Sequence, residues 1–298
     1  MLKEVRSGFN MKNSYDLEGQ IDAKYQMLLN YDKREIDNPD KYQPCGFYYL
    51  DKLKTVISII KREFPAPDQV RIGDFACAQG NISLILAESG YEMSAIDINP
   101  TFIEYSKMKY EKGKIEWIVG SIESLNFPAE ILDVAIAGEL LEHCAYPEEI
   151  MEKILGFVRP GGLLILTTPN GSKCKTSLPT FKQVSSKEQR KMFEERQFGP
   201  VGKHHLFLFK LKEIQCILPP EAEIIDKGYL GGTTLMNRYT KLFCKLFPLQ
   251  FVQDVNRVLS KVPVINTKTF NNIYVVLRKV TPANNDKGKE ESKNYFKS

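Results

Sequence analysis

A short loop at residues 74–81, Asp-Phe-Ala-Cys-Ala-Gln-Gly-Asn, carries the first residues whose types and spacing could bind a ligand. It follows an apolar run and precedes a stretch with helical spacing, so N–H groups at the start of that helix would face the ligand. Ala76, Ala78 and Gly80 are small and let a ligand approach the backbone closely. The spacing is not the G-x-G-x-x-G of dinucleotide-binding loops. Because Asp74 would repel a pyrophosphate, the loop favours a ligand with a cationic group, such as an amine.

Further candidate binding residues follow two later apolar runs. Asp97 ends the run 91–97, about 20 residues beyond the loop, where a carboxylate accepts hydrogen bonds from both hydroxyls of a ribose. Ile98 follows it directly. Ser121 and Ile122 come after the run 115–119, a position that suits the edge of an adenine. All four lie where strands are expected to end, and open α/β sheets bind their ligands at that edge.

The chain has three histidines, and each is a candidate for acid–base chemistry. His143 belongs to Glu139-Leu-Leu-Glu142-His143, in which Glu139 would share a helix face with Glu142 and His143 if the stretch is helical. His204 and His205 open an aromatic-rich stretch. We expect His204 or His205 to act as a general base, with His143 as a further candidate. We predict no metal; if one binds, its ligands would be Glu139, Glu142, His143 and His205.

Alternating strand-like and helix-like segments position these residues from residue 70 onward. Strands are expected at 70–75, 91–97, 115–119, 133–138, 162–168 and 273–277, and helices at 81–89, 100–111 and 147–158. This alternation is typical of a parallel sheet with helices on both faces.

The segments outside this alternation define the predicted organisation of the chain. We expect an N-terminal helical cap at 1–66, a ligand-binding core at 67–169 and a lid or substrate insertion at 170–209. The sheet is completed by 210–281, which contains a helical insertion at 231–270, and the polar tail 282–298 is expected to be disordered. Tyr42, Tyr48 and Tyr49 are expected to pack within the cap or to cover the ligand.

Composition excludes several classes of protein. With 298 residues, of which 43% are hydrophobic, the chain can bury a large core. No apolar run approaches the roughly 20 residues of a membrane-spanning helix, and the N-terminus is too polar for a secretory signal. Six scattered cysteines without a C-x-x-C pair argue against a zinc ribbon or a disulfide framework. These features predict a cytoplasmic protein.

The net charge of +4 conceals an uneven distribution. Residues 66–170 carry a net charge of −9, whereas residues 171–215 carry +6 and residues 227–279 carry +8. The acidic segment contains the loop and Asp97, where a cationic ligand is expected. The basic segments coincide with the two insertions, so we predict that a second ligand bound there is anionic or rides on an anionic carrier.

Five stretches together resemble the class I S-adenosylmethionine-dependent methyltransferases: DFACAQGN, AIDINP, GSIESLNF, LDVAIAGELLEHCAYPEEI and FVRPGGLLILTTPNG. They cover roughly residues 70–170, and the E-x-x-E-H and P-G-G sequences are shared with ubiquinone-pathway and sugar O-methyltransferases. The resemblance implies a Rossmann-like, doubly wound seven-stranded sheet, mostly parallel with an antiparallel last strand.

The resemblance also assigns roles to individual residues. The loop from Asp74 to Gly80 would line the methionine part of the cofactor and Asp97 would bind the ribose. Ser121 and Ile122 would flank the adenine, and Glu139 would lie beside the reacting centre. Ala76 and Ala78 stand where the family has glycine, and we expect a loop with negative φ to accommodate the two extra methyl groups.

The predicted function is therefore methyl transfer from S-adenosylmethionine, by in-line displacement, to an oxygen of a small-molecule, glycan or other biosynthetic intermediate. Two alternatives stay open. Small-RNA 2′-O-methyltransferases use a similar E-x-x-E-H plus a distal histidine to bind Mg²⁺, and a non-catalytic S-adenosylmethionine-binding protein would share the cofactor residues. No RNA-binding module is recognisable, so a nucleic acid partner is not expected. Peripheral membrane contact and a homodimer are further options for the apolar helical stripe at 235–247.

Overall fold

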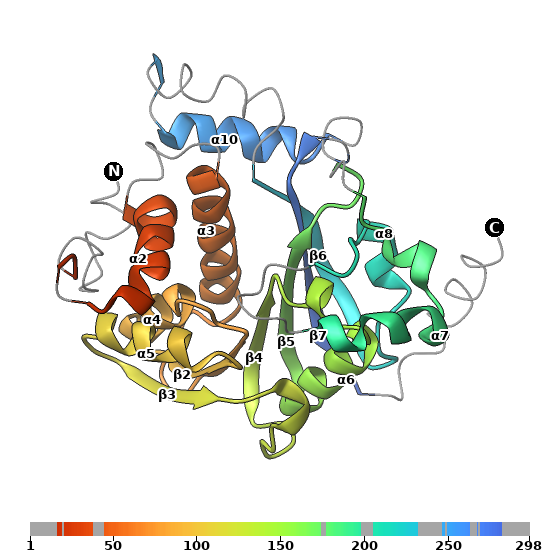
Figure 1. Cartoon of the computed structure of the whole chain (residues 1–298), viewed down its shortest axis with the longest axis horizontal. Coiled ribbons are helices and arrows are strands. Elements are labelled where there is room, and N and C mark those ends of the chain that lie inside the picture. Colours follow the sequence, from red (N-terminus) through yellow and green to blue (C-terminus); the bar gives the residue numbers. More distant parts are fainter. Residues whose placement is uncertain are drawn as a thin grey trace.

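A single seven-stranded sheet forms the centre of the protein (Figure 1). The computed structural model describes residues 17–19, 21–37, 45–173, 177–197, 205–231, 246–247, 249–262, 267 and 269–281. The strands are β1 (Arg71–Phe75), β2 (Glu92–Asp97), β3 (Lys114–Val119), β4 (Leu132–Gly138), β5 (Val158–Pro169), β6 (Ala222–Leu230) and β7 (Asn272–Lys279). Their order in the sheet is β3-β2-β1-β4-β5-β7-β6.

The direction of the strands confirms the predicted fold class. Strands β1 to β5 pair in parallel, and β7 is antiparallel to both of its neighbours, β5 and β6. Because β7 reverses direction, its first residue, Asn272, pairs with Pro169 at the end of β5 and with Leu230 at the end of β6. The ends of β4, β5 and β6 and the start of β7 therefore meet at one edge of the sheet.

Helices cover both faces of the sheet. The longer ones are α2 (Gln26–Asp32), α3 (Cys45–Glu63), α4 (Asn81–Glu88), α5 (Pro100–Lys109), α6 (Pro147–Phe157) and α10 (Leu249–Leu259), and α7 (Lys187–Arg190) and α8 (Leu211–Gln215) are short. Sequence chemistry fixes where several begin. Pro100 and Pro147 occupy the first turns of α5 and α6, and the Asn99 side chain accepts a hydrogen bond from the Thr101 N–H.

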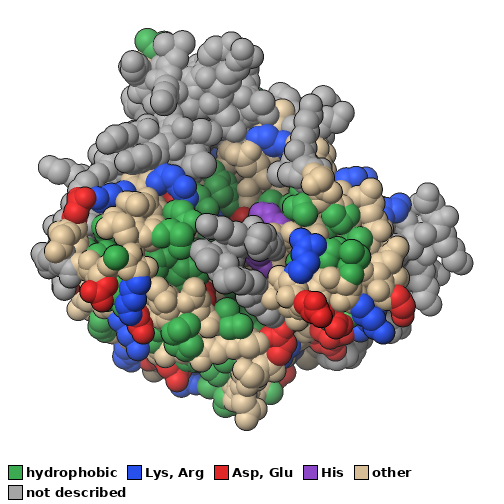
Figure 2. All heavy atoms as spheres, viewed as in Figure 1, with side chains coloured by type: hydrophobic (Ala, Val, Ile, Leu, Met, Phe, Trp, Pro, Cys, Tyr) green, Lys and Arg blue, Asp and Glu red, His purple; other side chains and the backbone are tan. Residues whose placement is uncertain are grey.

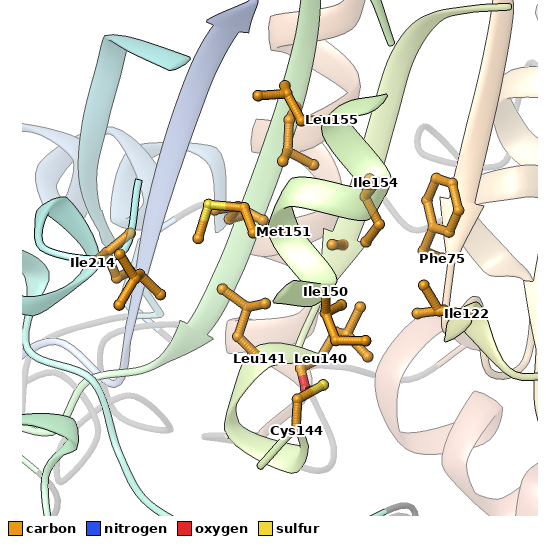
Figure 3. Close-up of a cluster of buried hydrophobic side chains, with 14 of the residues drawn as sticks. Phe75, Ile122, Leu140, Leu141, Cys144, Ile150, Met151, Ile154, Leu155 and Ile214 are labelled. Carbon is orange, nitrogen blue, oxygen red and sulfur yellow. Dashed lines mark hydrogen bonds between the residues drawn. The ribbon is translucent and has the colours of Figure 1, made fainter. Parts of the chain in front are cut away.

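Two apolar layers hold these helices against the sheet. On one face α3 and α4 pack Val56, Ile60 and Leu86 against Ile72 and Val134 of the central strands. On the other face α6 packs against β4 and β5, and Figure 3 shows its residues Ile150, Met151, Ile154 and Leu155 pointing into this layer. The apolar spacing of α6 that is visible in the sequence is thus the spacing of its buried face.

A buried polar cluster ties the N-terminal helix α2 to the helices that follow the first two strands. Lys109 of α5 and Asp32 of α2 form a salt bridge of 2.7 Å, with side chains 1% and 2% exposed. Asn81, the first residue of α4, donates to Asp32 (2.8 Å) and accepts from Lys109 (2.6 Å), and the Tyr105 hydroxyl donates to Asp32 (2.8 Å). The N-terminal segment is therefore fixed beside residue 81, where the predicted ligand loop ends.

Segment 177–197, within the predicted lid, is folded as short helical turns and α7. Buried Arg190 holds it by donating to the carbonyl oxygens of Ala145, Val184 and Ser185 and by pairing with Glu148 of α6. Part of the positive charge of this segment is thus structural. The tail 282–298 and most of the stripe 235–247 lie outside the described residues, as does Tyr42. Within the described part of the chain, every helix is too short or too polar to cross a membrane.

Candidate active site

The loop between β1 and α4 turns sharply through left-handed backbone conformations. Ala76, Ala78 and Gly80 have φ angles of 60°, 47° and 68°. The expectation of negative φ at the two alanines is therefore wrong. A left-handed residue with a side chain costs about 1–2 kcal/mol, because Cβ approaches the following carbonyl oxygen. Such strain is typical of functional sites that the surrounding structure fixes.

Gly80 is a position where a side chain would not fit. A Cβ atom built at Gly80 would lie 2.7 Å from the Ser106 Oγ and 3.0 Å from its Cβ. Ser106 is itself fixed by donating to the carbonyl oxygen of Phe102, at 2.8 Å. The glycine therefore permits the close packing of the loop against α5.

Asp97, at the end of β2, is anchored by two backbone N–H groups. Its Oδ2 accepts from Ala78 at 2.9 Å and its Oδ1 accepts from Asn99 at 2.8 Å. Burial raises the pKa of this carboxyl, and the two backbone donors oppose that shift. Each oxygen keeps a second lone pair, so Asp97 can accept one further hydrogen bond on each oxygen, as a diol requires.

Asp74 is a buried carboxyl at the start of the same loop. It is 4% exposed and accepts a hydrogen bond from the Ser83 hydroxyl at 2.6 Å. Burial raises its pKa to about 6, with a further contribution from nearby Asp97 and an opposing one from Lys52. A cationic group placed beside Asp74 would be stabilised by its ionised form.

One cavity of about 740 Å³ brings most of the predicted site residues together. It is lined by Asp74, Ala76, Ala78, Asp97, Ile98, Glu139, His143 and His205. This volume suits a small-molecule site. Figure 2 shows the histidine side chains within a hollow near the middle of the face in view. Gly80 shapes the loop without lining the cavity. Ser121 and Ile122 also lie outside the lining: Ile122 packs in the core beside α6, and the Ser121 hydroxyl donates to Glu123. Their role beside an adenine stays a prediction.

The N-terminal segment supplies further residues that line the cavity, which sequence reasoning did not assign in detail. Tyr31, Arg34 and Glu35 come from α2 and the turn after it, and Tyr49 and Lys52 come from α3. Arg34 pairs with Glu35 at 2.7 Å. The Lys52 ammonium lies 4.9 Å from the centre of the Tyr49 ring and forms no salt bridge with the described residues. Tyr49 and Lys52 are three residues apart on an amphipathic helix, which was the signal available in the sequence.

Glu139, directly after β4, is fixed in an unusual conformation. Its φ is 56°, and its N–H donates to the Thr167 carbonyl at 2.8 Å. Its carboxylate accepts from the Thr167 hydroxyl at 2.9 Å and from the Asn272 amide at 2.9 and 2.8 Å. The same amide nitrogen lies 2.5 Å from the hydroxyl of Tyr48. Residues from β4, β5, β7 and α3 thus hold one carboxylate at the cavity wall.

Glu142, His143 and His205 come together beside the cavity. Only residues 141–143 form a helical turn, so Glu139 does not share a helix face with Glu142 and His143. The rings of His143 and His205 are 4.9 Å apart between centroids, and Glu142 Oε1 lies 4.0 Å from His205 Nε2. His204 lies outside the described residues. One ligand atom from each of the three residues lies within 4.8 Å of the others.

The burial of Glu142 determines the electrostatics of this cluster. Its side chain is fully buried; Oε2 accepts from the Thr168 hydroxyl at 3.0 Å, and Oε1 has no hydrogen-bond partner among the residues that the structure describes. Burial raises the pKa of Glu142 well above its ordinary value, and nearby Glu139 adds to the shift. Burial lowers the pKa of His205, which favours the neutral imidazole that a general base requires.

Comparison with known proteins finds a family match for part of the chain. Residues 73–166 match the family described as "Methyltransferase domain". The chain is 32% identical over 103 residues to the mitochondrial ubiquinone biosynthesis O-methyltransferase of Schizosaccharomyces pombe, which covers 33% of this chain and 37% of that protein. It is 26% identical over 111 residues to the malonyl-[acyl-carrier protein] O-methyltransferase of Salmonella typhimurium, which covers 37% and 42%. The chain spans about half or less of the length of the curated relatives it matches.

A solved structure shows the same fold over a larger share of the chain. An S-adenosylmethionine-dependent methyltransferase from Mesorhizobium loti superposes with a TM-score of 0.50 and 13% identity, over 74% of this chain and 96% of that one. At this identity the match concerns the fold alone. It covers a larger share of the chain than residues 73–166.

Proposed function

We propose that this protein transfers a methyl group from S-adenosylmethionine to an oxygen of a biosynthetic intermediate. The premise is that residues 73–166 form a class I S-adenosylmethionine-dependent methyltransferase domain. The observation that carries the proposal is one cavity whose lining combines two groups of residues. We call the strained loop with Asp74 and Asp97 the first wall, and Glu139, His143 and His205 the second wall. A cofactor and an acceptor bound at these walls would lie next to each other.

The residues of the first wall fit S-adenosylmethionine. This cofactor has a ribose diol, a cationic sulfonium, an ammonium and a carboxylate. Asp97 retains a free lone pair on each oxygen for the diol, and Asp74 offers a buried carboxylate to the cationic end. Lys52, which forms no salt bridge with the described residues, could pair with the carboxylate of the cofactor. When bound, the cofactor supplies the activated methyl group.

A residue of the second wall would accept the proton that the acceptor loses. Methyl transfer is an in-line displacement, so the main task of the protein is to align the two reactants and exclude water. A hydroxyl acceptor must also lose its proton as it attacks. We assign this proton to His205, whose lowered pKa keeps the imidazole neutral near pH 7. His143, at ring-contact distance, is the second candidate, and Glu139, whose negative charge raises the pKa of His205 against the effect of burial, is placed to stabilise the imidazolium that forms.

The acceptor is proposed to be a small molecule that is anionic or attached to an anionic carrier. The support is the positive charge of segments 171–215 and 227–279, together with Lys52 in the cavity wall. The named relatives act in ubiquinone biosynthesis and on malonyl-[acyl-carrier protein], and both are O-methyltransferases by name. Replacing Lys52 with Met should raise either the Kd for S-adenosylhomocysteine or the KM for the acceptor; no change in either would remove Lys52 from both roles.

The experiment that tests the proposal is transfer of a labelled methyl group to a panel of hydroxyl-bearing biosynthetic acids and acyl carriers. Wild-type protein should label at least one acceptor, and His205→Ala should lower kcat by about 100-fold, the effect of removing a general base. The matched control, Met192→Ala, changes an exposed side chain outside the cavity lining and should leave turnover unchanged. Cofactor binding without labelling of any acceptor would instead support a non-catalytic binding protein.

A metal-dependent version of the reaction is tested by the same assay. Glu142, His143 and His205 provide one carboxylate and two imidazoles, a donor set that binds divalent transition metals, whereas Glu139 is already held by Thr167 and Asn272. We propose that the reaction needs no metal, so full activity should persist in EDTA. Loss of activity in EDTA that a divalent cation restores would overturn this part of the proposal.

A further inference from the structure

Helix α10 exposes a stripe of large apolar side chains. Phe251 and Val258 are 50% and 66% exposed and lie seven residues apart on one face of the helix, and Val262, three residues beyond its end, is 37% exposed. Phe247 contacts Phe251 with ring centroids 5.1 Å apart, and Leu246 is 66% exposed. We call Leu246, Phe247, Phe251, Val258 and Val262 the α10 stripe.

The α10 stripe is a concentration of exposed apolar surface. Among the residues that the structure describes, nine large apolar side chains are exposed, and five of these belong to this one segment of 17 residues. Single exposed apolar residues are ordinary, whereas a contiguous group marks a surface that binds something. Figure 1 shows α10 at the periphery of the molecule, beyond the end of α3.

The charge around the α10 stripe indicates what binds there. In the sequence, residues 238–268, which flank and include α10, contain six Lys or Arg and one acidic residue, Asp254. Arg257 and Lys261 lie on or directly after α10 and are exposed. Lysine is depleted from protein–protein interfaces, whereas an amphipathic helix with a basic flank is typical of helices that lie on anionic membranes. The combination therefore favours a lipid surface over a protein partner.

The topology places this helix at the edge of the sheet that carries the active site. The segment that contains α10 leaves the sheet after Leu230 and returns at Asn272, and these two residues pair with each other. The Asn271 amide donates to the Gly231 carbonyl at 3.1 Å and closes the base of the segment. Asn272 then contacts Glu139 in the cavity wall. A surface that holds α10 would thus lie at the edge of the sheet where the cavity opens.

We propose that the α10 stripe docks this protein onto an anionic lipid surface, with the apolar side chains inserted among the acyl chains and the basic residues against the headgroups. The inference goes beyond methyl transfer and does not depend on it, because docking can be measured without turnover. It also provides a route by which an acceptor dissolved in or attached to a membrane would meet the cavity.

The test is flotation of the full-length protein with vesicles of phosphatidylcholine alone, or of seven parts phosphatidylcholine to three parts phosphatidylglycerol. Wild-type protein should float with the vesicles that contain phosphatidylglycerol, and added salt should weaken the binding. Phe251→Ser/Val258→Ser should lower the partition coefficient by about tenfold or more, because two inserted apolar side chains are lost. Arg257→Glu/Lys261→Glu should abolish the preference for phosphatidylglycerol.

The control is Met192→Ser, which removes an exposed apolar side chain (68% exposed) from a different surface and should leave flotation unchanged. Circular dichroism of each variant establishes that it is folded. Folded wild-type protein that does not float, or equal flotation of wild type and Phe251→Ser/Val258→Ser, would overturn the proposal. A concentration-dependent dimer that Phe251→Ser/Val258→Ser abolishes, without vesicle binding by wild type, would assign the stripe to a second copy of the chain instead.

Discussion

The side-chain amide of Asn272 donates to both carboxylate oxygens of Glu139, at 2.9 and 2.8 Å, although the two residues are 133 positions apart in the chain. This contact joins the first residue of β7 to the residue that follows β4. It also lies next to the Tyr48 hydroxyl of α3. The cavity wall is therefore assembled from the N-terminal helices, the core and the last strand, and it forms only when the sheet is complete.

Asn272→Ala should weaken both the fold and the reaction. The substitution removes the donors of a carboxylate that is held at a left-handed φ, so the free energy of unfolding should fall by about 1–3 kcal/mol. We expect kcat to fall more than KM rises, because Glu139 would no longer be held beside the reacting groups. Asn271→Ala is the matched control: it removes the contact with Gly231 but none with Glu139, so kcat should be retained. Wild-type kcat and stability in Asn272→Ala would contradict this role.

Replacing the left-handed alanines with glycine should stabilise the protein. Ala76→Gly or Ala78→Gly relieves about 1–2 kcal/mol of backbone strain and costs about 0.5–1 kcal/mol in chain entropy, so the net gain lies between zero and about 1.5 kcal/mol. Gly80→Ala should do the opposite, because its Cβ would meet Ser106 at 2.7 Å. Urea unfolding measures all three variants. If Ala76→Gly destabilised the protein by more than about 1 kcal/mol, the left-handed conformation would not hold.

Cofactor affinity should depend on pH through Asp74. The carboxyl has a pKa of about 6, raised by burial, and only its ionised form attracts the cationic end of the cofactor. Affinity should therefore be constant above this pKa and should fall as the pH drops through 6, by up to about tenfold per pH unit. Titrations with S-adenosylhomocysteine, whose ammonium is retained, measure the effect. Asp74→Asn should bind weakly at every pH; a pH profile identical to that of wild type would exclude Asp74 as the titrating group.

Breaking the buried salt bridge between Lys109 and Asp32 should lower the free energy of unfolding more than breaking an exposed salt bridge. Lys109→Met leaves the Asp32 carboxylate buried without its counter-ion, a change that costs about 3–5 kcal/mol. The exposed pair Lys24–Glu104 is the matched control, since Lys24→Met should cost less than about 1 kcal/mol. Because Asp32 anchors α2 beside Asn81, Lys109→Met should also raise the Kd for S-adenosylhomocysteine. Equal stability losses in the two variants would contradict the buried network.

Local sequence patterns predicted much of the fold and of the first cavity wall. Alternating strands and helices place Asp74 and Asp97 at the carboxyl ends of adjacent parallel strands, so their proximity follows from topology alone. The pairing of His143 with His205 was also anticipated from residue type. In contrast, the sign of φ at Ala76 and Ala78 was predicted wrongly, because the loop is shaped by the contacts of Asp97 and Ser106 rather than by local preference.

The contacts that hold Glu139 in the second cavity wall and those that anchor the N-terminal segment could not be predicted from the sequence. Asn272 and Glu139, and likewise Asp32 and Lys109, are polar residues brought together by long-range packing, and neither pair has a spacing that a sequence pattern reveals. In the sequence, Lys52 is one of the polar residues of an amphipathic helix. Only the structure shows that it lines the cavity, where its ammonium could contact a ligand. Ser121 and Ile122 lie at the expected edge but outside the cavity lining.

We propose that one cavity binds the methyl donor through Asp97 and presents His205 to the acceptor. Calorimetric titration of S-adenosylhomocysteine into wild type, Asp97→Asn and His205→Ala separates these two roles. We predict binding of one molecule per chain to wild type, affinity reduced by about tenfold or more in Asp97→Asn, and unchanged affinity in His205→Ala. Folded wild-type protein that binds no S-adenosylhomocysteine, or Asp97→Asn that binds it as tightly as wild type, would contradict the account.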